Sequence, residues 1–148
     1  MKLNLGCGND VREGWQNVDN GYDLPDDVIT LDLNTLHWMN WTDNSVSEIE
    51  CFDVLEHLKS TVNFINECWR VLKPGGTLKI QVPRYDHPNV WLDPTHLRAY
   101  HPDTFDYFDP TTKWGQLYQM YSPYKWTILE KIDGIAIVVK MTPVKELK

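Results

Sequence analysis

Cysteine is scarce in this sequence. Its 148 residues include three cysteines, Cys7, Cys51 and Cys68, with no Cys-x-x-Cys spacing. Small secreted folds held by disulfides have an even number of cysteines, and structural zinc sites use closely paired ones. The sequence therefore argues against a disulfide framework and against a structural zinc site.

Long apolar runs and an excess of basic residues are also missing. No run approaches the roughly 20 apolar residues that cross a bilayer, and the N-terminus lacks the residue order of a signal peptide. The formal net charge is −7, whereas proteins that bind nucleic acid carry a basic surface against the phosphates. We expect a cytoplasmic protein that binds neither membrane nor nucleic acid.

The composition is that of a folded domain. Hydrophobic residues make up 42% and charged residues 24%, and the length is typical of one domain. The chain has no repeat, linker or low-complexity tract. We expect a single domain over residues 1–148.

Hydrophobic periodicity predicts alternating strands and helices. Residues 2–5, 17–19, 28–33 and 48–52 are strand candidates. Apolar residues then recur at helical spacing from Ser60, a good N-cap, to Leu72. The Lys-Pro-Gly-Gly run at 73–76 stops this helix, and 77–83 resumes as a strand, which gives a βαβ unit and a parallel sheet.

The last third of the chain has two different parts. Residues 84–125 are rich in proline, histidine and aromatic residues without clear periodicity, and a loop-rich insertion of this length is usually functional. We expect most of its aromatic side chains to form a local core. Residues 126–132 and 135–141 are strand-like and flank Asp133-Gly134, a hairpin signal because both residues accept positive φ.

The first strand ends in a glycine turn, Gly6-Cys7-Gly8. Glycine lets the backbone approach a ligand closely, and ligands of parallel sheets bind beyond the carboxyl ends of the strands. Asp19 and Asp32 end the next two strands, where carboxylates can accept hydrogen bonds from a ribose diol or an exocyclic amine. The alternative is an ordinary turn with two solvated carboxylates.

Three segments in order resemble class I S-adenosylmethionine-dependent methyltransferases. They are residues 3–8 (Leu-Asn-Leu-Gly-Cys-Gly), 53–58 (Asp-Val-Leu-Glu-His-Leu) and 70–78 (Arg-Val-Leu-Lys-Pro-Gly-Gly-Thr-Leu). Residues 14–19 (Gly-Trp-Gln-Asn-Val-Asp) and the Asp-Pro-Thr-His run at 93–96 are similar to a small branch of these enzymes. The resemblance covers nearly the whole chain.

The resemblance implies an α/β fold: a Rossmann-like, doubly wound, mostly parallel seven-stranded sheet that ends in an antiparallel hairpin. It implies S-adenosylmethionine as cofactor, with Gly6, Cys7 and Gly8 below its methionine and ribose. By the same resemblance Asp19 binds the ribose, Asp32 and Leu33 lie at the adenine, and Phe52 and Asp53 line the pocket near the methyl group.

The spacing departs from this family in one respect. Asp19 follows Gly6, and Asp32 follows Asp19, by only 13 positions. A full crossover helix normally requires more chain, so we expect the helices after the first two strands to be shortened or missing. Because no residues precede Met1 to form lid helices, we expect a partner or a second copy to complete the pocket.

His96 is the candidate catalytic residue, as a base or a substrate contact, because it follows the fifth strand at the active-site edge. The alternative is a loop histidine that bonds to nearby backbone. His87, His96 and His101 show no strong metal-binding spacing, so we expect no catalytic metal.

Glu56-His57 could act as an acid/base pair. Asp53 and Glu56 also have the spacing of a capping box at a helix start. We favour the structural interpretation of this pair.

The sequence thus predicts methyl transfer to an oxygen or nitrogen of a small molecule or glycan. One alternative is a non-catalytic S-adenosylmethionine-binding module or regulatory subunit. Another is a nicotinamide-dependent dehydrogenase, which is disfavoured because residues 6–11 lack the third glycine of that fingerprint.

Overall fold

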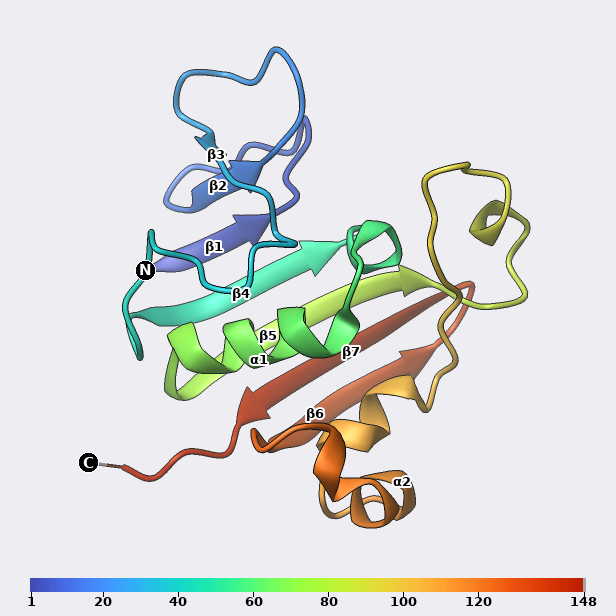
Figure 1. Ribbon diagram of the computed structural model, residues 1–148. Helices are drawn as coiled ribbons and strands as arrows, with labels where there is room; N and C mark the ends of the chain where they lie inside the picture. Colours follow the sequence, from blue (N-terminus) through green and yellow to red (C-terminus); the bar gives the residue numbers. More distant parts are fainter. Residues whose placement is uncertain (148) are drawn as a thin grey trace.

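The computed structural model describes residues 1–147, in which seven strands form one sheet in the order β3-β2-β1-β4-β5-β7-β6. The strands are β1 (Lys2–Leu5), β2 (Gln16–Asp19), β3 (Ile29–Thr30), β4 (Val46–Phe52), β5 (Leu72–Pro83), β6 (Trp126–Asp133) and β7 (Ala136–Pro143). Neighbours from β3 to β5 pair in parallel, and β7 is antiparallel to both β5 and β6. This confirms the mixed, mostly parallel sheet (Figure 1).

Within residues 1–147, two α-helices and four 3₁₀ turns complete the fold. They are α1 (Thr61–Val71), α2 (Lys113–Leu117), η1 (Leu55–His57), η2 (Pro88–Val90), η3 (Thr104–Phe108) and η4 (Gln119–Tyr121). Among residues 1–147, no helix is both long and apolar enough to cross a membrane.

The core lies on one face of the sheet because apolar side chains alternate with polar ones along the strands. The rows Leu3, Ile49, Leu78, Met141 and Leu5, Cys51, Ile80, Val139 run in register across β1, β4, β5 and β7 and are fully buried. The row between them, Asn4, Glu50, Lys79 and Lys140, belongs to the opposite face. The two faces therefore differ in polarity across the middle of the sheet.

The apolar face is covered by α1 and by the segment that precedes β6. The Tyr100 hydroxyl lies 2.6 Å from the hydroxyl of Thr61 in α1. The Ser122 hydroxyl donates to the side-chain carbonyl of Asn66 in α1 at 2.6 Å. Figure 1 shows α1 in front of this face and α2 beyond the β6 edge of the sheet. The alternate residues of β5 and β7 on the other face are only half-buried.

The connections 6–15, 20–28 and 31–45 contain no helix, which confirms the shortened crossovers. Part of the space on the α1 side is filled by Trp38 and Trp41, both buried. Trp38 contacts Phe64 of α1 with ring centroids 5.6 Å apart. The Trp41 indole donates to the Gln16 side chain of β2 at 2.7 Å.

Two buried asparagines fix the first connection. Asn4 of β1 donates to the side-chain carbonyl of Asn17 of β2 at 3.0 Å. Asn4 also donates to the Asp10 carbonyl, while Asn17 accepts from the backbone N–H of Arg12 and donates to its carbonyl. The Arg12 guanidinium then bonds to Asp10 and to Glu50 of β4. Side chains thus hold segment 6–15 where a helix would otherwise pack.

Three expected elements differ from the structure. The strand expected at 28–33 is only Ile29–Thr30, because the chain turns at Asp32, whose carboxylate accepts from the Asn34 N–H. Residues 73–76 do not precede β5 but lie within it, where the register with β4 shifts. The hairpin is present, but neither Asp133 nor Gly134 has positive φ.

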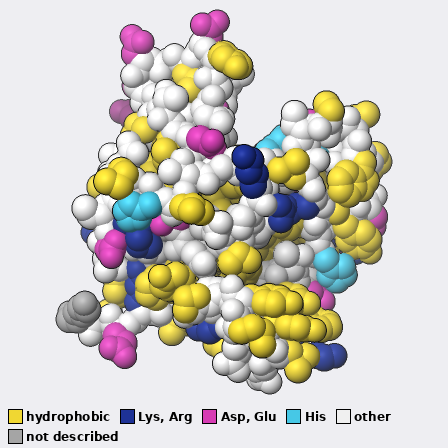
Figure 2. Space-filling view, viewed as in Figure 1, with side chains coloured by type: hydrophobic (Ala, Val, Ile, Leu, Met, Phe, Trp, Pro, Cys, Tyr) yellow, Lys and Arg dark blue, Asp and Glu magenta, His cyan; other side chains and the backbone are white. Residues whose placement is uncertain are grey.

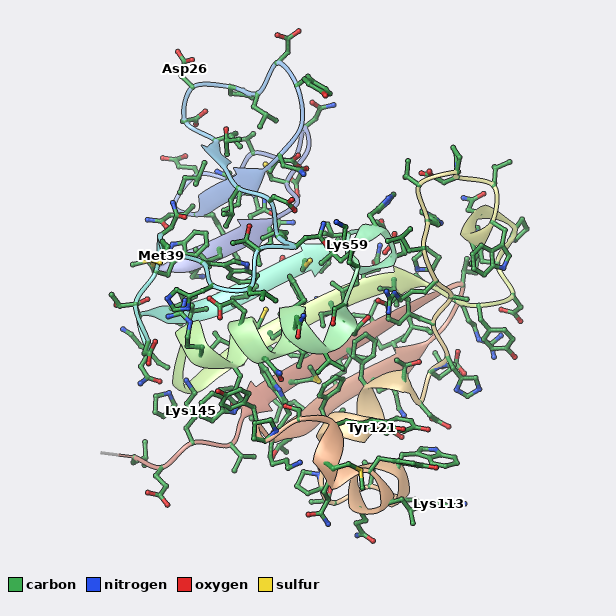
Figure 3. The ribbon with its side chains drawn as sticks, viewed as in Figure 1. Asp26, Met39, Lys59, Lys113, Tyr121 and Lys145 are labelled. Atoms are coloured by element: carbon green, nitrogen blue, oxygen red, sulfur yellow. The ribbon has the colours of Figure 1, made fainter. Side chains whose placement is uncertain are left out.

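The aromatic side chains of residues 84–125 are divided between core and surface. Tyr100, Phe105 and Phe108 are buried, as expected of a local core. A second group, Tyr107, Trp114, Tyr118 and Tyr121, stacks ring on ring beside α2. Figure 3 places Lys113 and Tyr121 at this outer end of the molecule. The local-core expectation therefore holds only for the first group.

Ser60 is predicted to stabilise α1 through its cap. Its hydroxyl accepts from the backbone N–H of Asn63 at 3.1 Å, so Ser60→Ala leaves that donor without its partner. We expect the free energy of unfolding in urea to fall by about 1 kcal/mol. Ser60→Asp, which keeps a capping oxygen, is the matched control. Equal losses in both variants would contradict the assigned role.

Candidate functional site

The sheet has one topological switch point, between β1 and β4. The chain leaves β1 toward β2 and β3 and leaves β4 toward β5 on the other side. Loops that diverge in this way open a crevice beyond the carboxyl ends of the two strands, where ligands of such sheets bind. Gly6 directly follows β1 and Asp53 directly follows β4, so both lie at this crevice.

A groove of 240 Å³ lies at the switch point. Of the residues expected to bind a cofactor, it is lined by Gly6, Asp19, Asp32, Leu33 and Asp53. It is also lined by six residues that the sequence did not predict to bind the cofactor, although it named His57 in a possible acid/base pair: Asn20, Leu31, Asn34, Val54, His57 and Leu58. Each of the six lies within two residues of a predicted cofactor-binding residue or belongs to the Asp-Val-Leu-Glu-His-Leu run. They could therefore have been predicted from their nearness to the ends of the strands.

Three expected residues do not line this groove. Cys7 is buried, and burial raises the pKa of its thiol above the ordinary value. Gly8 is exposed beside the groove. Phe52 packs on the polar side of the sheet, with the Arg12 guanidinium 5.5 Å and the Lys79 ammonium 5.9 Å from its ring centroid.

The glycine turn forms hydrogen bonds to β2 and packs closely against the segment after β4. The backbone N–H groups of Gly6 and Cys7 both donate to the Val18 carbonyl, at 2.8 and 3.0 Å. Gly6 has φ +67°, and a Cβ there would lie 2.1 Å from Cγ2 of Val54. Both the conformation and the space therefore require glycine at this position.

The Asp19 carboxylate orders the groove from the end of β2. Its Oδ2 accepts from the Gly8 N–H, and its Oδ1 accepts from the N–H groups of Asn20 and Gly21, each at 2.8 Å. A carboxylate offers about four acceptor positions. One position on Oδ2 thus stays open for a hydroxyl of a ligand.

The far end of the groove is closed by a contact between two loops. The Asn34 side chain, two residues after Asp32, accepts from the backbone N–H of Lys59 at 2.8 Å. This bond joins the segment after β3 to the segment after η1. Lys59 is labelled near the middle of Figure 3.

A larger cleft of 540 Å³ adjoins the groove. Its lining comprises Asp53, Glu56, His57, Pro83, His87, Asn89, Leu92, Asp93, His96, Ile135 and Ala136. Asp53 and His57 line both hollows. Figure 2 shows the surface indented between the part that carries β2 and β3 and the loop after β5. Two ligands bound side by side would therefore meet at Asp53 and His57.

His96 enters the cleft from the loop after β5. Its Nδ1 lies 2.7 Å from the Val90 carbonyl, which can only accept, so Nδ1 donates to it and Nε2 is the nitrogen that faces the cleft. Nε2 lies 3.6 Å from Oδ2 of Asp93 and 4.0 Å from Oε1 of Glu56. The side chain is 7% exposed. His96 thus makes the backbone contact expected of a loop histidine and still presents a basic nitrogen.

His57 is held in the same tautomer by a chain of hydrogen bonds. The Thr95 hydroxyl donates to Oδ1 of Asp93 at 2.7 Å, so its oxygen accepts from Nδ1 of His57 at 2.8 Å. The other ring nitrogen of His57, Nε2, lies 4.0 Å from Oε1 of Glu56. The rings of His57 and His96 meet edge to face at 4.7 Å.

Glu56 lies between the two imidazoles and is 2% exposed. Its Oε2 is buried without a hydrogen-bond partner. Burial, more than the nearby Asp53, raises the pKa of this carboxyl to about 7. The expected capping box of Asp53 and Glu56 is wrong, because η1 is a short 3₁₀ turn whose N-cap, Val54, makes no side-chain capping bond.

The loop 84–100 brings His96 to Glu56 through the backbone. The Leu97 N–H donates to the Glu56 carbonyl at 2.7 Å, and the Arg98 guanidinium donates to the carbonyls of Leu58 and Lys59. His101 is exposed and stacks on Tyr85. The structure thus groups His96 with Glu56 and His57.

Comparison with known proteins identifies similar sequences. A family model described as a methyltransferase domain matches residues 7–80, half of the chain. A Mycolicibacterium smegmatis S-adenosylmethionine-dependent methyltransferase is 44% identical over 41 residues. That match spans 28% of this chain and only 16% of the relative.

Solved structures share the fold at low identity. A Haloferax volcanii methyltransferase, in complex with the Trm112 methyltransferase activator, aligns with a TM-score of 0.65 at 14% identity, over 95% of this chain and 81% of that chain. A SAM-dependent methyltransferase from Archaeoglobus fulgidus aligns with a TM-score of 0.65 at 16% identity, over 95% and 85%. One from Aquifex aeolicus aligns with a TM-score of 0.64 at 15% identity, over 97% and 81%.

The two glycines of the turn provide a matched pair of substitutions. Gly6→Ala introduces both positive-φ strain and a clash with Val54, whereas Gly8→Ala introduces strain alone, since nothing lies within 4 Å of its added Cβ. We expect Gly8→Ala to lower the free energy of unfolding by about 1–2 kcal/mol and Gly6→Ala by more.

Val54→Ala in the Gly6→Ala background removes the clashing methyl groups. It should recover part of the lost stability, measured by urea unfolding. A double variant no more stable than Gly6→Ala would refute the contact as the cause.

Proposed function

The chain belongs to the methyltransferase-domain family, and from this we propose that it transfers a methyl group from S-adenosylmethionine to an oxygen or nitrogen of a small molecule or glycan. The cofactor lies in the groove at the switch point and the acceptor in the adjoining cleft. The observation that carries the proposal is that both hollows share Asp53 and His57. A dehydrogenase is no longer an alternative.

The groove offers a separate contact for each part of the cofactor. Asp19 accepts from the ribose hydroxyls through the open position on Oδ2. Asp32 accepts from the adenine amine, with Leu33 packed beside the ring. Gly6 lies below the methionine part, and Asp53 lies where the sulfonium methyl faces the cleft. Gly8 contributes indirectly, because its N–H orients Asp19.

Cys7 and Phe52 support this groove without lining it. Cys7 fixes the turn through its N–H bond to Val18. Phe52 lies at the end of β4, directly before Asp53, and packs under Arg12 of segment 6–15. We assign both residues a supporting role at the cofactor site.

The reaction is a direct displacement at the methyl carbon. A lone pair of the acceptor oxygen or nitrogen forms the new bond to carbon, and the carbon–sulfur bond breaks with its electron pair on sulfur, giving S-adenosylhomocysteine. The acceptor proton passes to the free Nε2 of His96. Alignment of the two reactants accounts for up to roughly 7–11 kcal/mol of such a barrier, and a base adds roughly a hundredfold or more.

The lining of the cleft favours a polar acceptor with an apolar side. Glu56, Asp93 and His96 lie at one wall and suit a hydroxyl or amino group. Leu92 and Ile135 give an apolar wall on which one side of a saccharide or small ring can pack. We therefore favour a saccharide hydroxyl within the proposed acceptor class.

Two further proposals concern assembly and catalysis. The half-buried face of the sheet supports a second copy or a partner that completes the site. A methyltransferase solved with an activator, as in Haloferax volcanii, gives this proposal a precedent.

A domain that binds the cofactor without transferring its methyl group is the alternative function, and the reduced crossovers favour it.

Asp19→Ala is expected to abolish micromolar binding of S-adenosylhomocysteine. The variant removes the ribose acceptor and also releases the N–H groups of Gly8, Asn20 and Gly21. Tryptophan fluorescence titration measures the affinity. Asp26→Ala, the same charge change at an exposed position, serves as control and should bind normally.

Failure of the unaltered protein to bind the nucleoside at millimolar concentration would overturn the proposed function. Binding by Asp19→Ala equal to that of the unaltered protein would instead overturn only the role of Asp19.

His96→Ala is expected to lower methyl transfer roughly a hundredfold or more, measured as S-adenosylhomocysteine formed with a panel of saccharide and amine acceptors. Cofactor affinity should not change, because His96 does not line the groove. His101→Ala, at an exposed histidine outside the cleft, is the control. Unchanged turnover in His96→Ala would remove His96 from the mechanism.

A further inference from the structure

We propose that Glu56, His57 and His96 form a binding site for one divalent transition-metal cation, of the zinc class, in the wall of the acceptor cleft. The role of the cation in the reaction rests on the proposed function, whereas the test of metal binding is independent of it. Among residues 1–147, these three form the group of histidine, cysteine and acidic side chains whose ligand atoms all lie within 4.8 Å of one another.

The first argument is that three potential metal-ligand atoms converge. The Val90 carbonyl and the Thr95 hydroxyl accept hydrogen bonds from Nδ1 of His96 and of His57, so the other ring nitrogen, Nε2, is the one that each imidazole directs toward Glu56. Each Nε2 lies 4.0 Å from Oε1 of Glu56, too far for a hydrogen bond. Nitrogen and carboxylate lone pairs that face one another repel unless a proton or a cation lies among them.

The second argument is the buried carboxylate itself. Glu56 is 2% exposed, and its Oε2 has no partner. A buried carboxyl either takes up a proton, which the raised pKa of Glu56 favours, or is paired with a cation or bound to a metal. Lysine and arginine are absent from the lining of this cleft. A bound cation would supply the missing partner.

The third argument is the support behind each histidine. Imidazoles that bind metals almost always donate their other N–H to a carbonyl, carboxylate or water. His96 does so to a backbone carbonyl, and His57 does so to Thr95, which is itself held by Asp93. The side chains are thus oriented as ligands before any metal binds.

The donor set identifies the cation. Two imidazole nitrogens and one carboxylate form the ligand set of catalytic zinc sites, which keep a position open for water or substrate. Tetrahedral zinc with bonds of about 2.1 Å separates its ligand atoms by about 3.4 Å. The 4.0 Å from each Nε2 to Oε1 of Glu56 must therefore shorten by roughly 0.6 Å when a metal binds. The open position faces the cleft, with Asp93 as a further carboxylate beside it.

The cation would act on the acceptor rather than on the cofactor. Held by Glu56, His57 and His96, such a cation would supply Lewis-acid chemistry: it would lower the pKa of an acceptor hydroxyl beside it, whose proton would pass to water. His96 then contributes as a ligand, and the proton no longer passes to its Nε2. Methyl transfer itself proceeds as described above.

The test is a calorimetric titration of zinc chloride into the full-length protein after removal of metal with a chelator. We expect one zinc per chain. Glu56→Gln, which keeps the shape but removes the charge, should weaken binding roughly a hundredfold or more. His101→Ala, outside the cluster, should bind as the unaltered protein does. Circular dichroism checks that each variant is folded.

A second variant tests the supporting bond. Thr95→Val keeps the volume but removes the acceptor of the His57 proton, and it should weaken zinc binding roughly 10- to 100-fold. Zinc held by unrelated surface histidines would be insensitive to both Glu56→Gln and Thr95→Val. That insensitivity, or no zinc binding at all, overturns the proposal.

The titration contains no cofactor and no acceptor. A protein that binds S-adenosylhomocysteine but not zinc therefore keeps the proposed function, with His96 as the free base, and loses only the metal site. A protein that binds zinc at Glu56 but no nucleoside loses the proposed function and keeps the site.

Discussion

The bond between Asn4 and Asn17 is the constraint on which the N-terminal half of this protein depends. Parallel strands are normally joined by a helix that satisfies its own backbone groups. Here the connection between β1 and β2 has no helix, and the two buried amides instead bond to the backbone of Asp10 and Arg12. Each such group left unpaired in the interior would cost about 1–3 kcal/mol. The amides thereby fix the loop in which Gly6 and Gly8 face Asp19.

The functional region is assembled from two parts of different origin. The groove comes from the ends of β1, β2 and β4 and is fixed by the sheet, because the switch point between β1 and β4 leaves their carboxyl ends open. The cleft comes from η1 and from the loop after β5, which is held over η1 by the bond from Leu97 to Glu56. Asp53 and His57 join the two. If the groove binds the cofactor and the cleft binds the methyl acceptor, as proposed, substitutions in the groove affect cofactor binding and substitutions in the cleft affect the reaction with the acceptor.

The cluster at η1 shows how local bonds determine the chemistry of a site. Val90 and Thr95 each accept a hydrogen bond from Nδ1 of one imidazole, so His96 and His57 both direct Nε2 toward the buried Glu56. Without those two acceptors, either ring could turn or change its tautomer. In the proposed reaction Nε2 of His96 takes a proton from the methyl acceptor, and in the proposed metal site it binds a cation. The fold is the same in both cases, and the roles differ only in whether a cation is bound.

Features that depend on neighbouring residues could be predicted from the sequence. Alternation located β1, β2 and β4, helical spacing located α1, and the ends of these strands located Gly6, Asp19 and Asp53 at one edge. The orientation of Glu56 could not be predicted, since the spacing of Asp53 and Glu56 fits a helix cap equally well. It follows from the three-dimensional fold that Glu56 points inward and meets His96, 40 positions further along the chain. That contact comes from the loop 84–100 folding back over η1, and its hydrogen bonds join residues distant in sequence, for which periodicity gives no signal.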